Sequence, residues 1–178
     1  MTPESVAQRV AAGLPDGIIA IDGPSGSGKS TFADLLVDAL RADGRRPVLI
    51  RADDFATWDT PAAWWPELER DVLCTYRRNH DYEYRPRVWA DGVPRLGPPK
   101  LVAWSPLLII EGVTTARRSV ADRLARALWL DGPDAGSRLE RTVVRDGEHE
   151  RANLAAWQRF EEGWFAVDGT RERCEVVG

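Results

Sequence analysis

The chain has 178 residues, with 24 basic and 28 acidic side chains and a net charge of −4 at pH 7. This length can bury the core of one domain, and the charge balance gives no bulk field that attracts nucleic acid or anionic lipid. The two cysteines lack metal-ligand spacing, and there is neither a run of about 18 apolar residues nor a charged-then-apolar leader. We therefore expect one cytoplasmic domain over residues 1–178, with no nucleic-acid or membrane partner.

The first part of the chain alternates between helix and strand patterns. Residues 3–12 predict a short helix that Thr2 is placed to cap. The apolar run 17–22 predicts a strand buried on both faces. Residues 31–42 predict a helix with one apolar side, and residues 47–51 predict a second strand.

The middle of the chain has a weaker pattern. Apolar spacing over 61–79 indicates a helix in its later part, whereas residues 80–106 are rich in Pro, Gly, Arg and aromatic side chains. We expect a small hairpin there that pairs residues near 87–89 with residues near 101–103. The whole stretch 56–106 is predicted to be an insertion on the substrate side.

The last part returns to regular alternation. Residues 107–112 form the most apolar predicted strand, and further strands are predicted at 127–130 and 175–177. Helices are predicted at 119–126, 134–146 and 152–165. Strands that alternate with helices predict an α/β fold, a five-stranded parallel sheet with helices on both faces. Ligands of such sheets bind at the carboxyl ends of the strands.

The most specific motif follows the first predicted strand. Residues 23–30 read G-P-S-G-S-G-K-S, which matches G-x-x-x-x-G-K-[ST] between a strand and a helix. In such a loop backbone N–H groups converge on phosphate oxygens, a lysine neutralises the outer phosphates and a hydroxyl ligates Mg²⁺. We therefore expect ATP or GTP to bind here, against the alternative of a chance turn. The expected contacts are Gly23, Ser25, Gly26, Ser27, Gly28, Lys29, Ser30 and Thr31.

Acidic residues follow two other predicted strands. Asp53 and Asp54 come after the second strand, and Glu111 comes after the third. Phosphoryl transfer needs a phosphate cradle, oxygen ligands for a hard cation and a carboxylate near the acceptor oxygen. These acids can supply both the cation ligands and the carboxylate, although turn chemistry for the pair and capping for Glu111 are the alternatives.

Arginines line one side of the predicted helix 134–146. Arg138, Arg141 and Arg145 are spaced by three and four residues, which places them along a common face. Facing the phosphates, they would form a lid over about 138–151 that neutralises transferring charge and excludes water. Facing solvent, they would pair with Glu140, Glu148 or Glu150.

Four segments in this order carry a family resemblance: 21–31, 52–55, 109–112 and 138–146. Together they resemble the uridine kinase-like family of P-loop kinases, which includes uridine–cytidine kinases, nicotinamide riboside kinases and bacterial cytidylate kinase-like proteins. The resemblance runs from about residue 17 to 178 and implies a P-loop NTPase fold with a small lid. It also implies that Asp53 is the base, that Ser30, Asp53 and Glu111 surround Mg²⁺, and that Arg141 and Arg145 belong to the lid.

The substrate side departs from that family. Ala56 stands where the family has an aromatic residue, residues 82–84 only approximate its substrate segment, and its arginine-rich segment is reduced to 147–151. Aromatic rings here could stack on a planar ligand, and core packing is the alternative for each. The candidate substrate contacts are Asp54, Trp58, Tyr82, Tyr84, Arg85 and Trp89.

The sequence thus predicts a Mg²⁺-dependent kinase. The γ-phosphoryl of ATP or GTP would move to a hydroxyl of a nucleoside-like small molecule, with Asp53, Lys29, Arg141 and Arg145 as catalytic residues. A nucleoside monophosphate kinase, using arginines of 77–87, is one alternative. An NTP-gated switch or assembly factor, with the Trp-rich segment 58–65 as an exposed patch, is another. The acceptor, the choice of ATP or GTP and the oligomeric state, a homodimer included, stay open.

Overall fold

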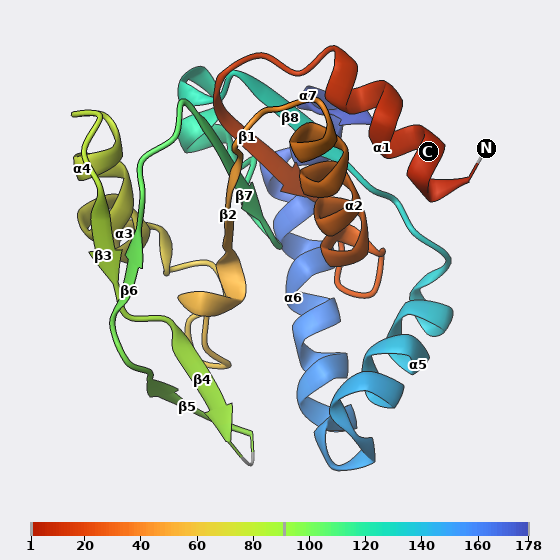
Figure 1. The fold of residues 1–178 in the computed structure, drawn as a ribbon. Coiled ribbons are helices and arrows are strands. Elements are labelled where there is room, and N and C mark those ends of the chain that lie inside the picture. Colours follow the sequence, from red (N-terminus) through yellow and green to blue (C-terminus); the bar gives the residue numbers. More distant parts are fainter. Residues whose placement is uncertain (1, 91, 178) are drawn as a thin grey trace.

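The computed structural model describes residues 2–90 and 92–177, and its centre is a five-stranded sheet in which every pair of neighbours is parallel (Figure 1). The strand order is β2-β7-β1-β8-β9. This confirms the predicted α/β fold and its five strands. Their bounds are Gly17–Asp22 (β1), Val48–Arg51 (β2), Leu107–Glu111 (β7), Arg126–Trp129 (β8) and Glu175–Val176 (β9).

Both faces of the sheet are covered, which is why its central strands are apolar throughout. On one face Ile19 and Ile109 pack under two helices, α1 (Pro3–Ala12) and α2 (Lys29–Ala42). On the other face Ile18 and Ile110 pack against the chain that follows β2. Alternate side chains of one strand therefore enter two separate cores, as expected for a buried parallel strand.

A helical stretch after β2 covers part of the second face. It consists of α3 (Trp65–Leu68), a π-helical segment η2 (Glu69–Leu73) and α4 (Cys74–Tyr76). Leu68, Val72 and Leu73 are almost completely buried on its inner side. The predicted helix in the later part of 61–79 is confirmed, with an extra residue per turn in its middle.

Two small antiparallel pairs replace the single hairpin that we predicted. Strand β3 (Tyr82–Tyr84) pairs with β6 (Lys100–Val102), and β4 (Arg87–Ala90) pairs with β5 (Val93–Leu96). The predicted pairing of 87–89 with 101–103 is therefore wrong. The sequence Asp-Gly at 91–92 is a strong two-residue turn signal, so β4 pairs with its nearest neighbour and leaves β6 for β3.

The last third of the chain is mostly helical. The predicted helix 119–126 is a shorter 3₁₀-helix, η3 (Arg118–Arg123), because β8 already begins at Arg126. Beyond β8 come α5 (Ala135–Asp146), the 3₁₀ turn η4 (Glu148–Glu150), α6 (Arg151–Asp168) and α7 (Thr170–Arg173). Asp134 caps α5 as predicted, accepting the Ser137 N–H at 3.0 Å.

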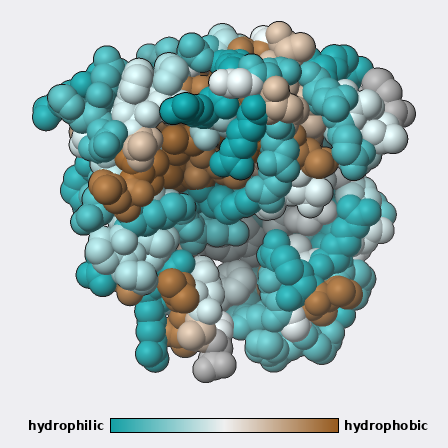
Figure 2. Space-filling view, viewed as in Figure 1, coloured by the Kyte–Doolittle hydropathy of each residue, from teal (hydrophilic) through white to brown (hydrophobic). Residues whose placement is uncertain are grey.

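In the view drawn, the β4–β5 hairpin and α5 lie on opposite sides of α6 (Figure 1). The surface between the hairpin and α5 is hollowed (Figure 2). None of the helices in the described residues is both long and apolar enough to cross a membrane.

Candidate active site

The predicted phosphate-binding loop lies between β1 and α2, at the carboxyl edge of the sheet. Gly26 has a φ of +74°, and a Cβ there would lie 2.6 Å from the carbonyl oxygen of Arg138 in α5. Only glycine fits such a backbone at such a contact. The loop is therefore packed directly against the start of α5.

Asp22, the last residue of β1, anchors the loop. Its carboxylate is fully buried and accepts the N–H groups of Gly23, Thr114 and Ala116 at 2.7, 2.9 and 2.8 Å. Burial raises the pKa of Asp22 to about 6, although the three hydrogen bonds and the charge of Lys29 act in the opposite direction. This residue, which sequence reasoning missed, ties the loop to the segment after β7.

Ser30 contacts Glu111, and the charge of Lys29 reaches the same carboxylate. Ile21 is the register partner of Glu111, so the acid at the end of β7 lies beside the loop. The Ser30 hydroxyl donates to Glu111 Oε1 at 3.2 Å, and the buried Lys29 ammonium donates to the Pro24 carbonyl at 2.8 Å. Burial raises the pKa of Glu111, and the charge of Lys29 lowers it.

This pair of oxygen ligands fits Mg²⁺. Proteins bind Mg²⁺ through one or two carboxylates together with substrate phosphates, rather than through a full protein cage. Within residues 2–90 and 92–177 no group of three or more His, Cys, Asp or Glu side chains could hold a metal. Arg51, which sequence reasoning also missed, donates to the second Glu111 oxygen at 3.1 Å.

The acidic pair sits in η1 (Ala52–Asp54), directly after β2. Asp53 is exposed; burial raises the pKa of both Glu111 and Asp54, and the negative charge of Asp53 raises both further. Asp54 differs, because it accepts the Tyr84 hydroxyl at 2.6 Å. The two acids therefore have separate environments, and Asp53 is the one left open to a ligand.

The lid arginines are not equivalent. Arg145 donates to Asp146 at 2.6 Å, and the pKa of Arg145 is raised by that hydrogen bond and also by the charges of Asp53 and Glu111. Arg145 is thus within electrostatic reach of both candidate site acids. Arg141 and Arg145 are both exposed, and Arg138 donates to the Pro133 carbonyl at 2.7 Å. The alternative partners Glu140 and Glu148 both bind Arg151.

A further acid reaches the loop from α6. Glu161 Oε2 accepts the backbone N–H of Ser25 at 2.9 Å and its hydroxyl at 3.0 Å. Burial raises the pKa of Glu161, while Lys29, Ser25 and the nearby Trp157 indole lower it. Sequence reasoning missed this residue as well. The sequence does contain one indication that Glu161 is buried. Glu161 is an acid at helical spacing from Leu154 and Trp157, and so lies on the apolar face of the helix.

The candidate substrate residues divide into two groups. Tyr82 and Tyr84 lie in the apolar core and are only 3% and 2% exposed. Arg85 donates to the Gly97 carbonyl at 2.9 Å, between the two small strand pairs. Trp58 and Trp89 instead meet edge to face at 5.2 Å, and Trp58 also borders a cavity of about 120 Å³ beside α6.

Two of the three tryptophans in the segment 58–65 are internal. Trp64 and Trp65 are buried, and the Arg117 guanidinium lies over their rings at 4.9 and 5.2 Å. Trp164 of α6 contributes a third ring at 5.4 Å. Burial lowers the pKa of Arg117 to about 10. This cluster joins the segment 58–65 to α6 and to the segment after β7.

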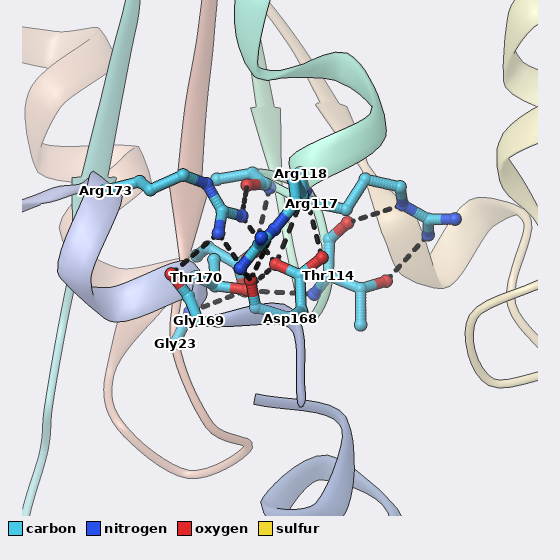
Figure 3. A network of polar contacts seen from close by, with 10 residues as sticks. Gly23, Thr114, Arg117, Arg118, Asp168, Gly169, Thr170 and Arg173 are labelled. Atoms are coloured by element: carbon cyan, nitrogen blue, oxygen red, sulfur yellow. Dashed lines mark hydrogen bonds and ion pairs between the residues drawn. The ribbon is translucent and has the colours of Figure 1, made fainter. Parts of the chain in front are cut away.

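The C-terminal end of α6 is fixed to the same segment. Figure 3 shows Arg118 and Arg173 converging on Asp168 and Gly169. Asp168 accepts the Arg118 N–H at 3.0 Å, and Arg173 also donates to the Ala116 carbonyl at 3.2 Å. Because Ala116 donates to Asp22, one hydrogen-bonded path connects α6 with the loop anchor.

No family model and no curated protein sequence matches the chain. Solved structures do. A protein from Bacillus stearothermophilus, described as a possible uridine kinase, matches with a TM-score of 0.72 at 15% identity over 99% of this chain and 97% of that chain. A candidate fructose transport system kinase from Silicibacter sp. TM1040 matches with a TM-score of 0.61 at 20% identity over 92% and 95%. The chain has the fold of the P-loop kinases. Residues 23–30, which carry the G-x-x-x-x-G-K-[ST] motif, are called the P-loop below; they lie at the carboxyl edge of the sheet, where parallel α/β sheets bind ligands.

Proposed function

We propose that the chain is a Mg²⁺-dependent small-molecule kinase that transfers the γ-phosphoryl group of ATP or GTP to a hydroxyl of a nucleoside-like acceptor. The observation that carries the proposal is the convergence of Lys29, Ser30 and Glu111 at the P-loop, with the charges of Asp53 and Arg145 within reach. The two similar structures, described as uridine and fructose transport kinases, support a small polyhydroxylated acceptor.

Each group has a role that its chemistry allows. The P-loop amides and Lys29 bind and orient the triphosphate. Ser30 and Glu111 would hold Mg²⁺, which neutralises charge on the phosphates when it is bound. Exposed Asp53 orients the acceptor hydroxyl and takes its proton, and Arg145 stabilises charge on the transferring group.

The acceptor side favours a hydroxyl over a phosphate. A monophosphate acceptor would need free arginines, but Arg87 forms two hydrogen bonds with Glu67 and Arg77 pairs with Glu69. Burial of Trp64 and Trp65 also removes most of the exposed patch that a switch would offer to a partner.

A panel of acceptors tests the proposal. The chain would be incubated with Mg²⁺ and ATP or GTP, together with uridine, cytidine, fructose, UMP or CMP, and nucleoside diphosphate formation would be measured. We expect release that depends on a neutral hydroxyl compound and disappears in Lys29→Ala. Equal release without any acceptor would favour the switch, and turnover with UMP or CMP alone would favour a monophosphate kinase.

A further inference from the structure

A carboxylate of the chain itself accepts hydrogen bonds from donors of the P-loop. Ser25 directs both its N–H and its hydroxyl at Glu161 Oε2, at 2.9 and 3.0 Å. Glu161 is only 2% exposed, and it lies 136 residues further along the chain, in α6. Backbone N–H groups of such loops form a binding site for anions. The Glu161 carboxylate therefore stands as an anion on a surface that is built for phosphate oxygens.

Several buried polar atoms on the P-loop and α6 lack hydrogen-bond partners among the described residues, as in a ligand site and unlike a well-packed core. The second oxygen of Glu161, Oε1, is buried and accepts no hydrogen bond of normal geometry in the part of the chain that the structure describes, although the Trp157 indole lies close enough to lower the pKa of Glu161. The Ser27 hydroxyl in the P-loop and Nε2 of Gln158 on α6 have no hydrogen-bond partner there either. Buried polar atoms without partners are costly and rare in finished cores. These atoms belong to the P-loop and to α6, the two segments that the Ser25–Glu161 contact joins.

Charge then decides what Glu161 does to a nucleotide. A triphosphate brings several negative charges to the P-loop, and like charges in a buried site repel with little screening by salt. Lys29 lies close enough to Glu161 for its charge to lower the pKa of that carboxyl. The same ammonium must also neutralise the phosphates, so the internal carboxylate and the ligand compete for it.

We propose that Glu161 is a residue of the donor-phosphate site that opposes phosphate binding and so sets how tightly the P-loop holds its nucleotide. In the nucleotide-free chain its carboxylate holds Ser25. When a triphosphate or diphosphate binds, the Glu161 carboxylate either loses its contact with Ser25 or stays in place and is repelled by the phosphate charges. The inference rests on the proposed binding of nucleotide by the P-loop and goes beyond it.

The test compares two neighbouring acids of α6. Glu161→Gln removes the charge with almost no change in shape, and Glu162→Gln removes the same charge from the adjacent, exposed position. Binding of ADP and of ATP to the full chain would be measured by titration calorimetry in Mg²⁺ buffer, without an acceptor. We expect Glu161→Gln to bind both about tenfold more tightly than the parent, or about 1.4 kcal/mol. Glu162→Gln should stay within about twofold.

The possible failures are distinguishable. Equal or weaker nucleotide binding by Glu161→Gln, with a parent chain that does bind, would overturn this inference and leave the proposed kinase intact. A parent chain that binds neither nucleotide would overturn the proposed function as well. Glu161→Met, which also lacks the charge, must show the same gain, and it carries the test if thermal unfolding shows that the glutamine variant does not fold.

Discussion

Replacing Asp22 with asparagine tests how the P-loop is anchored. Oδ1 of Asp22 accepts two N–H groups, those of Gly23 and Thr114, and Oδ2 accepts that of Ala116 at 2.8 Å. Asparagine keeps an oxygen for the first two donors but turns its own N–H₂ toward Ala116. One fully buried N–H group is then left without an acceptor, which costs about 1–3 kcal/mol. We expect the free energy of unfolding at pH 7 to fall by about 2 kcal/mol.

The same substitution has a defined pH dependence. Burial raises the pKa of Asp22 from 3.8 to about 6 in the folded chain. The stabilisation that Asp22 gives is therefore fully present below pH 3.8 and is lost as the pH rises through about 6. A difference of roughly two pKa units corresponds to about 3 kcal/mol. The stability gap between parent and Asp22→Asn should thus widen by up to about 3 kcal/mol from pH 7 to pH 4.

Urea unfolding followed by tryptophan fluorescence at several pH values measures this gap. Asp59→Asn is the matched control, because Asp59 is more exposed than Asp22 and the substitution changes the net charge equally. Its gap to the parent should stay small at every pH. A gap for Asp22→Asn that is constant, or that narrows toward pH 4, would refute the assignment of Asp22 as a buried anchor with a raised pKa.

The other predictions concern single groups of the site. Lys29→Ala should weaken ATP binding by about 10–100-fold in calorimetry, because a charge-assisted contact to phosphate is lost; unchanged affinity would contradict its role. Arg145→Ala should lower kcat by about 10²-fold or more in steady-state assays with the best acceptor, because Arg145 lies near the charges of Asp53 and Glu111, and Arg141→Ala should lower kcat by much less; equal effects would reject the distinction between them. Arg117→Lys should lose about 2–3 kcal/mol in urea unfolding, since the donors to Thr114 and Ala62 cannot all be replaced; full stability would show that the contacts are dispensable.

Local patterns were sufficient for most of the fold. An apolar run such as 107–112 that is flanked by predicted helices indicates a buried parallel strand. The carboxyl ends of such strands lie at one edge of the sheet. The position of Glu111 beside the P-loop therefore follows from the strand pattern alone. Asp134 is predictable as a helix cap for a similar reason, because capping depends on residues three positions apart.

What the sequence did not reveal depends on contacts between distant segments. Ser25 and Glu161 are 136 residues apart, and no local rule links them. From the sequence, Asp22 is only the last residue of a strand. Its role as an anchor depends on its three hydrogen-bond partners, which come from the P-loop and from the segment after β7. Tyr82 and Tyr84 illustrate the reverse case. An aromatic side chain has the same pattern in a core as in a pocket, and only packing distinguishes the two.

The central claim is that Asp53 prepares an acceptor for attack on a triphosphate held by the P-loop. The most direct measurement is acceptor-dependent transfer by Asp53→Asn, with nucleotide affinity determined on the same preparation. We predict that transfer by Asp53→Asn is about 10²–10⁴-fold slower than by the parent, while ATP binds to both equally tightly. Transfer at the parental rate would contradict the claim.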